Sequence, residues 1–325
     1  MSDYFLGIDI GATKSHALVA DKAGRALGLG VGPAGNHEVV GYEGLIRTLN
    51  AIAGDALRQA GISKDQLAGA GLGVAGYDWP SEREPTRAAI QTLELAVPYE
   101  FVNDTMIGLL AGTTQAWGVA VVSGTSNNCW GRDRQGREGQ MTGCGPFMGE
   151  YGGSSELVGR AIQVVAMAWT RRGPATRLTE ALIERVGARD ALDLLEGLAL
   201  ERYALTAADA PLVFKVAAEG DEVARQAIEW AGRELGSLAV GVIRQLGFED
   251  LEFEVVMIGS MFKGSQRLAE TMLASIQLVA PGARLVRLNA PPVVGGVLLG
   301  MEQAGVEGGR LRGTLIETTN ALFRK

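Results

Sequence analysis

The chain has 325 residues, which at roughly 100–200 residues per domain predicts two domains. Its 47% hydrophobic and 21% charged residues are ordinary for a globular protein and exclude a disordered or collagen-like chain. A net charge of −7 argues against nucleic-acid binding, and no apolar run is long enough to span a membrane. Cys129, Cys144 and the two histidines lack zinc-site spacing, so we expect free thiols in a cytoplasmic protein.

The first third of the chain predicts the order β-β-β-α-β-α-β-α, a mixed sheet flanked by helices. Short apolar runs bounded by turn residues indicate the strands, and apolar residues at helical spacing indicate the helices. We expect strands at 4–10, 14–20, 25–31, 68–74 and 99–102, and helices at 42–60, 83–93 and 106–112.

This pattern restarts at residue 118, with strands expected at 118–122 and 128–132. An offset of 112 residues carries Thr13 to Thr125 and Asp21 to Asp133, and it carries Gly24 to Gly136. Such an offset indicates an internal repeat and predicts two related α/β halves that face each other. The alternative is two ordinary hairpins.

A helical insert over about 155–250 distinguishes the second half. We expect helices at 155–170, 175–186, 190–198, 208–218 and 221–245, then a strand at 252–258, a helix at 265–279, a strand at 284–286 and a helix at 292–305. The tail, 311–325, is predicted to be an amphipathic helix. We therefore expect domains at 1–115 and 116–310, with the C-terminal helix packing back on the first.

Glycine is the outlier, with 46 residues, about twice its usual share of about 7%. The excess predicts tight turns and close approaches of the backbone. Two stretches, 30–35 and 71–76, match the GxGxxG pattern, but neither passes from a strand directly into a helix. A Rossmann dinucleotide site is therefore not expected, and the GxxxxGK[ST], HExxH and GxSxG motifs are missing from the sequence.

An acidic residue, Asp9, lies inside the first apolar strand and is followed by a glycine-containing turn and Thr13. A buried carboxylate must be paired, protonated or bound to a metal, and exposed turn N–H groups can hold phosphate. The pattern therefore predicts that Asp9 holds a hydrated magnesium ion beside phosphate. Residues 123–128 repeat the arrangement, so two turns could clamp one polyphosphate. The alternative for Asp9 is a hairpin residue that caps the turn.

A second acidic residue, Asp104, follows the strand at 99–102 and precedes a helix. Ligands of open α/β sheets bind at the carboxyl ends of strands, so this carboxylate could accept a hydroxyl proton during phosphoryl transfer. The alternative is that Asp104 is a helix N-cap.

Four segments carry a family resemblance, and they come in a fixed order: 7–14 (GIDIGATK), 102–104 (VND), 122–129 (VSGTSNNC) and 145–152 (GPFMGEYG). Together they resemble the sugar kinase/Hsp70/actin (ASKHA) superfamily, and within it the N-acetylglucosamine kinase branch of the BadF/BadG/BcrA/BcrD ATPase family. The resemblance implies two ribonuclease-H-like, actin-like ATPase domains with mixed five-stranded sheets flanked by helices and a cleft between them.

The resemblance also implies roles for particular residues. Asp104 matches the catalytic base, and Asp9 matches the residue that holds magnesium through water. The phosphates of ATP would contact Gly11, Thr13, Lys14, Gly124 and Thr125. The adenosine pocket would include Ala217, Gly259, Ser260 and Lys263. The sugar would contact Asn36, Asp104, Asn128, Gly145 and Glu150. Several glycines, including Gly7 and Gly295, fall in candidate ligand loops.

Two departures from the family pattern leave the sugar open. Cys144 precedes Gly145 where the family usually has Trp, and Glu150-Tyr151 replaces Asp-Glu. A site that hydrogen-bonds hydroxyls is sensitive to such changes.

The implied activity is transfer of the ATP γ-phosphate to a hydroxyl of an amino sugar, either N-acetylglucosamine or glucosamine, with Mg²⁺. The expected partner is a small sugar, and the family suggests a homodimer. Two alternatives stay open: a BadF-type ATPase activator that carries an iron–sulfur cluster, and a non-catalytic sugar sensor.

Overall fold

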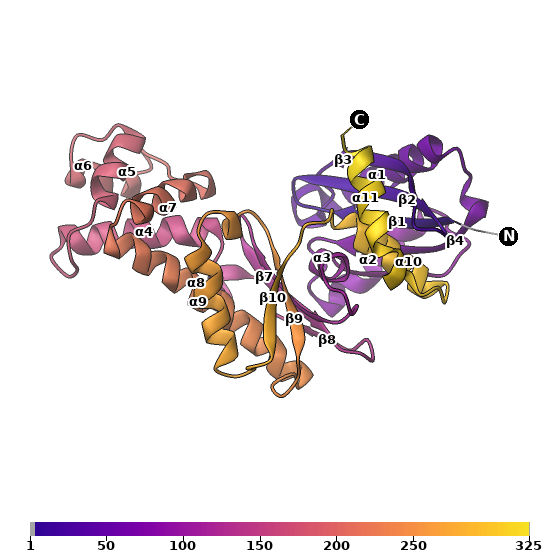
Figure 1. The fold of residues 1–325 in the computed structure, drawn as a ribbon. Coiled ribbons are helices and arrows are strands. Elements are labelled where there is room, and N and C mark those ends of the chain that lie inside the picture. The colour runs from indigo at the N-terminus through magenta and orange to yellow at the C-terminus, as the bar shows by residue number, and fades with distance from the viewer. Residues whose placement is uncertain (1–3, 325) are drawn as a thin grey trace.

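The computed structural model describes residues 4–324, which form two five-stranded sheets with helices around them (Figure 1). The first sheet has the order β3-β2-β1-β4-β5. β1, β2 and β3 are antiparallel neighbours, whereas β4 and β5 run parallel to β1. The strands are β1 (Tyr4–Ile10), β2 (Lys14–Asp21), β3 (Ala26–Pro33), β4 (Leu67–Val74) and β5 (Tyr99–Asn103).

The second sheet repeats this plan, with the order β10-β9-β6-β7-β8. β6, β7 and β8 are antiparallel neighbours, and β9 and β10 run parallel to β6. The strands are β6 (Gly118–Ser123), β7 (Asn127–Arg132), β8 (Glu138–Gln140), β9 (Phe253–Ile258) and β10 (Ala283–Arg287). The sequence does not predict β8, because its three residues have no apolar alternation.

The turns after β2 and β7 have the same structure at the offset of 112 residues. Oδ1 of Asp21 accepts hydrogen bonds from the backbone N–H groups two and four residues later, both at 2.9 Å. Oδ1 of Asp133 accepts the equivalent pair at 2.9 and 2.8 Å. Oδ2 of each aspartate accepts from the Nε of an arginine, Arg25 at 2.7 Å and Arg137 at 2.6 Å. The internal repeat is therefore confirmed in topology and in turn geometry.

Helices cover both faces of the first sheet. α1 (His37–Ala60) and α2 (Arg83–Gln91) pack on the face that presents Leu6 and Ile8, and α10 (Val293–Gln303) and α11 (Arg312–Leu322) pack on the face that presents Phe5. α3 (Asp104–Gly112) lies beside α10 and also contacts β6 of the second sheet. We call the first sheet with these helices the first lobe. α10 belongs to the segment 116–310 that the sequence assigns to the second domain, yet it packs on the first lobe. The domain limits themselves remain predictions.

Glycines make the close contacts between α10 and its neighbours. A Cβ atom on Gly7 or Gly71 would collide with the backbone of α10, and one on Gly295 would collide with the carbonyl of Ile107 in α3. Gly30 lies in the same way against α1, at Ile52. The assignment of Gly7 and Gly295 to ligand loops is therefore wrong, because these glycines let a helix approach a strand or another helix.

The second sheet and its helices form the second lobe, which lies on the left and centre of Figure 1. The insert predicted at about 155–250 is present, and its outer helices extend away from the sheet. The helices are α4 (Ser154–Trp169), α5 (Leu178–Val186), α6 (Ala191–Ala199), α7 (Ala210–Ala218) and α8 (Glu222–Leu246), followed after β9 by α9 (Gln266–Gln277).

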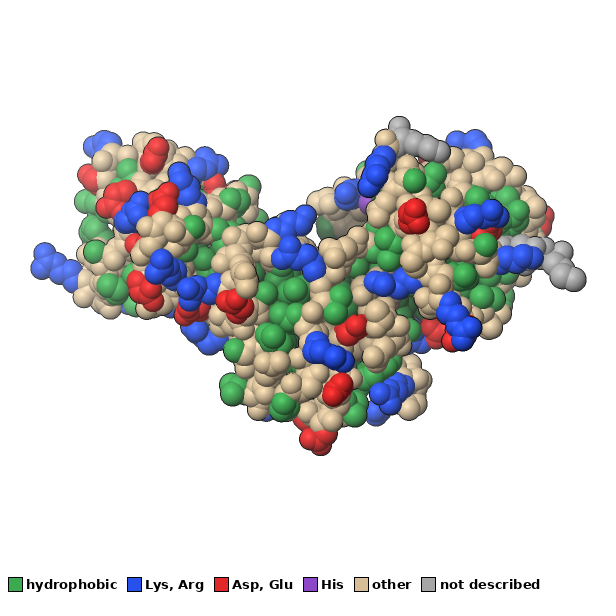
Figure 2. Space-filling model, in the orientation of Figure 1, with side chains coloured by type: hydrophobic (Ala, Val, Ile, Leu, Met, Phe, Trp, Pro, Cys, Tyr) green, Lys and Arg blue, Asp and Glu red, His purple; other side chains and the backbone are tan. Residues whose placement is uncertain are grey.

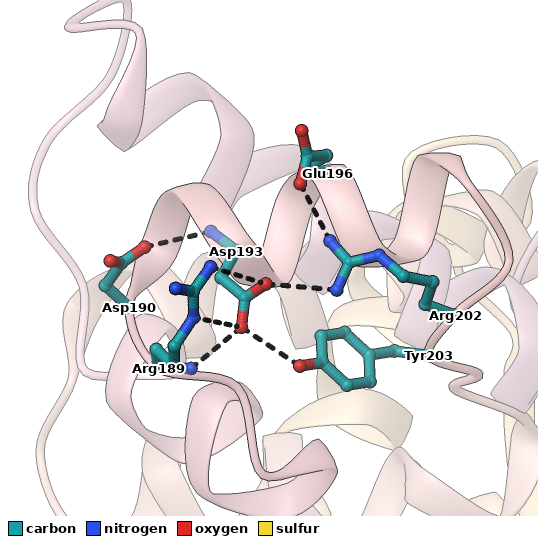
Figure 3. A network of polar contacts seen from close by, with 6 residues as sticks. All are labelled: Arg189, Asp190, Asp193, Glu196, Arg202 and Tyr203. Carbon is teal, nitrogen blue, oxygen red and sulfur yellow. Dashed lines mark hydrogen bonds and ion pairs between the residues drawn. The ribbon is translucent and has the colours of Figure 1, made fainter.

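A buried aspartate, Asp193, ties the outer end of the insert together (Figure 3). Its carboxylate accepts hydrogen bonds from the backbone N–H of Arg189 at 3.0 Å, from the hydroxyl of Tyr203 at 3.0 Å and from Arg202 at 3.1 Å. These bonds, the one from the Arg189 backbone foremost, hold the pKa of Asp193 well below its ordinary value. The connections on either side of α6 are therefore held together by one carboxylate.

The lobes are joined through α3 and α10 and by an ion pair between Arg132 of β7 and Glu302 of α10, whose Nη1 and Oε2 lie 2.9 Å apart. The surface is hollowed between the two lobes (Figure 2). Within residues 4–324, no helix is long and apolar enough to cross a membrane. Both thiols are free, as predicted, with Cys129 buried and Cys144 exposed.

Candidate active site

Three carboxylates lie in or after the last residues of three neighbouring parallel strands of the first sheet. Asp9 lies near the end of β1, Asp78 in the loop after β4, and Asp104 directly after β5. The carboxyl ends of these strands meet at one sheet edge, so the three side chains gather there. Burial, and then the charges of Asp9 and Asp78, raise the pKa of Asp104 to about 7. A carboxyl group that ionises near neutral pH is suited to accept a hydroxyl proton.

The residue that caps α3 is Asn103, the neighbour of Asp104. Its Oδ1 accepts a hydrogen bond from the backbone N–H of Thr105 at 2.9 Å. The alternative interpretation of Asp104 as the N-cap is therefore wrong.

Asp78, which the sequence does not single out, connects the two lobes. Its Oδ1 accepts hydrogen bonds from Nδ2 of Asn103 at 3.0 Å and from Nδ2 of Asn128 at 3.3 Å. The signal that identifies Asp104, an acidic residue just after a parallel strand, also applies to Asp78. It is weaker there, because three residues separate Asp78 from the end of β4.

The turn between β1 and β2 presents the first set of predicted phosphate residues. Thr13 and Lys14 are exposed, and Gly11 is half-buried behind them. The carbonyl of Gly11 accepts from the backbone N–H of Gly35 at 3.1 Å and of Asn36 at 3.4 Å. The turn is therefore fixed to the loop that carries a predicted sugar-binding residue.

The turn between β6 and β7 presents the second set. The carbonyl of Gly124 accepts from the backbone N–H of Ser154 at 2.9 Å and from its hydroxyl at 2.8 Å, so the start of α4 braces the turn. Gly259, with φ of 111°, lies so close to Ser123 that a Cβ atom would collide with its carbonyl. Thr125 is exposed at the tip.

A cavity of about 540 Å³ opens beside this second turn. Three predicted nucleotide residues line it, namely Thr125, Ser260 and Lys263. Ala217 and Gly259 do not line it, and Ala217 is buried in the core of the second lobe. The full lining is Thr125, Ser154, Ala207, Ala208, Ala210, Pro211, Phe214, Ser260, Met261, Lys263 and Gly264.

The predicted sugar residues reach the site from both lobes. Asn36 is buried and caps α1, its Oδ1 accepting from the backbone N–H of Glu38 at 2.8 Å. α1 begins with a short turn at His37, and Gly41, with φ of 68° and ψ of 169°, interrupts the helix, so its long segment starts at the predicted residue 42. Asn128 reaches across the cleft to Asp78 at 3.3 Å.

Glu150 is buried and organises the loop before α4. Its Oε1 accepts from the backbone N–H and hydroxyl of Thr142 at 2.7 and 2.9 Å, and its Oε2 accepts from the backbone N–H of Gly145 at 3.2 Å. Gly145 has φ of 61°, which favours glycine. The two predicted sugar residues of this loop are therefore fixed relative to each other.

The site fits a magnesium–nucleotide complex by the chemistry of its donors. The Asp9 carboxylate, whose Oδ2 lies 3.6 Å from Nδ1 of His16, offers the oxygen ligands that magnesium prefers. Within residues 4–324, no cluster of three or more His, Cys, Asp or Glu side chains could hold a metal ion directly. Magnesium at Asp9 would therefore be held mainly by water and phosphate, as is usual for this ion.

Comparison with known sequences gives relatives along nearly the whole chain. A profile of the BadF/BadG/BcrA/BcrD ATPase family matches residues 6–300. An N-acetyl-D-glucosamine kinase of Dictyostelium discoideum is 26% identical over 312 residues, covering 92% of this chain and 98% of that protein. An N-acetylmuramic acid/N-acetylglucosamine kinase of Clostridium acetobutylicum is 24% identical, covering 91% of this chain and 97% of that protein.

Solved structures share the fold. A proposed N-acetylglucosamine kinase of Chromobacterium violaceum has a TM-score of 0.63 at 25% identity and covers 91% of this chain and 98% of that chain. A ROK-family glucokinase of Streptomyces griseus, in complex with glucose and AMPPNP, has a TM-score of 0.53 at 17% identity and covers 98% and 99%. The predicted actin-like ATPase fold with two mixed five-stranded sheets is therefore confirmed.

Proposed function

Because this chain belongs to the BadF/BadG/BcrA/BcrD ATPase family, we propose that it is an ATP-dependent kinase of an amino sugar, either N-acetylglucosamine or glucosamine. One observation carries the proposal. Asp104, whose pKa is raised to about 7, lies at the same sheet edge as the turn that presents Thr13. A base and a phosphate-binding turn at one edge suit phosphoryl transfer to a hydroxyl.

In the proposed reaction, Asp104 accepts the proton of a sugar hydroxyl as its oxygen attacks the γ-phosphorus of ATP. The bond from the γ-phosphorus to the β,γ-bridging oxygen breaks, and ADP leaves. Gly11, Thr13 and Lys14 of the first turn and Gly124 and Thr125 of the second contact the phosphates from opposite lobes. Magnesium, held by Asp9 through water, would neutralise phosphate charge. Approach of the lobes would exclude water that could otherwise hydrolyse ATP.

We assign the adenosine to the cavity lined by Ser260 and Lys263. Its apolar wall would be formed by Pro211 and Phe214 and not by Ala217. We assign the sugar to the cleft between Asn36 and Asn128, with the loop that Glu150 organises closing one side. Two of the relatives have N-acetylglucosamine kinase in their names, which supports an amino sugar here.

Two features disfavour the alternatives. Cys129 is fully buried in β7, so it cannot ligate an iron–sulfur cluster at an exposed interface. The raised pKa of Asp104 suits a general base, which favours a catalytic role over sensing alone. Iron analysis of the purified protein tests the first alternative directly.

A coupled ADP-release assay over a sugar panel tests the proposal. The panel contains N-acetylglucosamine, glucosamine, N-acetylmuramic acid and glucose, each with ATP and magnesium and each repeated with EDTA. We expect the largest stimulation with N-acetylglucosamine or glucosamine, and none in EDTA. Release that no sugar stimulates would rule out the kinase.

A further inference from the structure

We propose that Asp78 is a positioning residue for this transfer, because one of its carboxylate oxygens holds groups from both lobes beside the proposed base. The inference rests on the proposed function and deepens it. It assigns a role to a residue that neither the motifs nor the family resemblance singled out.

On the first lobe, Asp78 fixes the start of α3. Oδ1 of Asn103 is committed to the backbone N–H of Thr105 at 2.9 Å, so the amide nitrogen of Asn103 must point the other way. That nitrogen donates to Oδ1 of Asp78 at 3.0 Å and to the carbonyl of Tyr77 at 3.2 Å. The first turn of α3, which carries Asp104, is therefore anchored through Asn103.

On the second lobe, the same oxygen of Asp78 orients Asn128. Oδ1 of Asn128 accepts from the backbone N–H of Cys129 at 2.8 Å, and its Nδ2 donates to Asp78 at 3.3 Å. The carbonyl of Asp78 also accepts from Nε2 of Gln140 at 2.9 Å. Gly143 lies so near that a Cβ atom there would be 3.0 Å from Cγ of Asp78. Asp78 is therefore contacted by three residues of the second lobe, namely Asn128, Gln140 and Gly143.

The backbone of the Asp78 loop is held independently of the Asp78 side chain. Oε2 of Glu82 accepts from the backbone N–H groups of Asp78 and Trp79, both at 2.8 Å. A change at the Asp78 carboxylate therefore leaves the loop anchored, which makes the role testable by substitution.

The charge around Asp78 agrees with this role. Burial raises the pKa of Asp78 to about 6, the hydrogen bond from Asn128 opposes that rise, and the carboxylates of Glu38, Glu82 and Glu150 add to it. Asp78 is therefore largely ionised above neutral pH, and an ionised carboxylate is a stronger acceptor for the two amide donors than a neutral group.

The test compares Asp78→Ala with Asp78→Asn. Alanine removes the acceptor, whereas the amide oxygen of asparagine can still accept from both Asn103 and Asn128. For Asp78→Ala we expect kcat/KM for the sugar to fall about 10- to 100-fold, as for loss of one to two hydrogen bonds at a reacting centre. The fall should come from both a higher sugar KM and a lower kcat, with the KM for ATP changed less than about twofold. Asp78→Asn should recover most of the loss.

Glu84→Ala is the matched control, because Glu84 lies six residues further along and its side chain is 79% exposed. It should match the wild type in both KM values and in kcat. Asp78→Ala with wild-type sugar kinetics per folded molecule, even with a lower melting temperature, would overturn the positioning role. Asparagine as damaging as alanine would also overturn it. A wild-type protein that no sugar stimulates would instead overturn the proposed function.

Discussion

At the scale of single residues, Asp104 shows a conflict between function and stability. In the folded protein the carboxyl group of Asp104 has a pKa of about 7, whereas in the unfolded chain its pKa is close to the ordinary value of 3.8. Stability therefore falls as the pH rises through this window. Asp104→Asn removes this half-buried charge, so we expect a higher melting temperature at pH 8 and a gain that shrinks as the pH falls toward 4.

The same substitution should remove the base. We expect Asp104→Asn to lose about 10²- to 10⁴-fold in kcat, the usual contribution of a general base, while still binding ATP and sugar. Calorimetric titration and the ADP-release assay measure the two effects separately. Near-normal kcat would contradict the role of Asp104, and an unchanged melting temperature at pH 8 would contradict its raised pKa.

The pKa of Asp104 also predicts a pH profile. The base must be ionised to accept a proton, so log kcat/KM for the sugar should rise with a slope of about one between about pH 6 and 7 and level off above it, with a steeper dependence below about pH 6, where Asp78 also takes up a proton. Steady-state rates from pH 5.5 to 9 at saturating ATP measure this. A flat profile across pH 6–8 would show that the ionisation of Asp104 does not limit the reaction.

Residues of the site differ in how far the sequence predicts them. Asp104 could be found because it follows a strand directly, and the turns because they recur at a fixed offset. Asp78 could not, because its importance comes from side chains of β5 and β7 that only the folded chain brings to it. The family resemblance implies that Ala217 lies in the adenosine pocket, but its side chain is buried in the core of the second lobe.

At the scale of elements, the repeated turns provide an internal comparison. Burial alone would raise the pKa of Asp21 and Asp133, but hydrogen bonds from Arg25 and Arg137 and from turn N–H groups hold both pKa values below the ordinary one. Asp21→Ala and Asp133→Ala each leave two backbone donors without their acceptor. We expect each to lower the free energy of unfolding by about 1–3 kcal/mol at pH 7.

Urea unfolding measures both variants, with Asp55→Ala as the control. Asp55 makes a half-exposed ion pair with Arg58 at 2.7 Å, which is worth less than about 1 kcal/mol. Because the stabilisation from Asp21 and Asp133 requires ionised carboxylates, the loss should shrink as the pH falls below about 3.8. Very different losses at the two turns would contradict their equivalence.

At the scale of the whole molecule, local patterns predict each sheet but not how α10 joins them. The strand order follows from apolar runs and turns, which the chain repeats. The position of α10 depends on glycines where it meets β1, β4 and α3. Gly7, Gly71 and Gly295 let the backbones approach closely at these three contacts. From the sequence alone, Gly7 and Gly295 are predicted to lie in ligand loops. Nothing local distinguishes a glycine in a turn from one that makes room for a helix.

The two lobes hold different parts of the proposed reaction, so we expect them to approach each other further when both substrates are bound. The nucleotide cavity is lined by residues of the second lobe, whereas Asp9, Thr13 and Asp104 belong to the first. The radius of gyration should therefore fall when a non-hydrolysable ATP analogue and the sugar bind together, and fall less with the analogue alone. Small-angle X-ray scattering of the free, singly bound and doubly bound protein measures this, with a sugar that gives no ADP release as the control. If the radius is the same in all states, the lobes are already aligned, and exclusion of water must depend on loops such as the one that Glu150 organises.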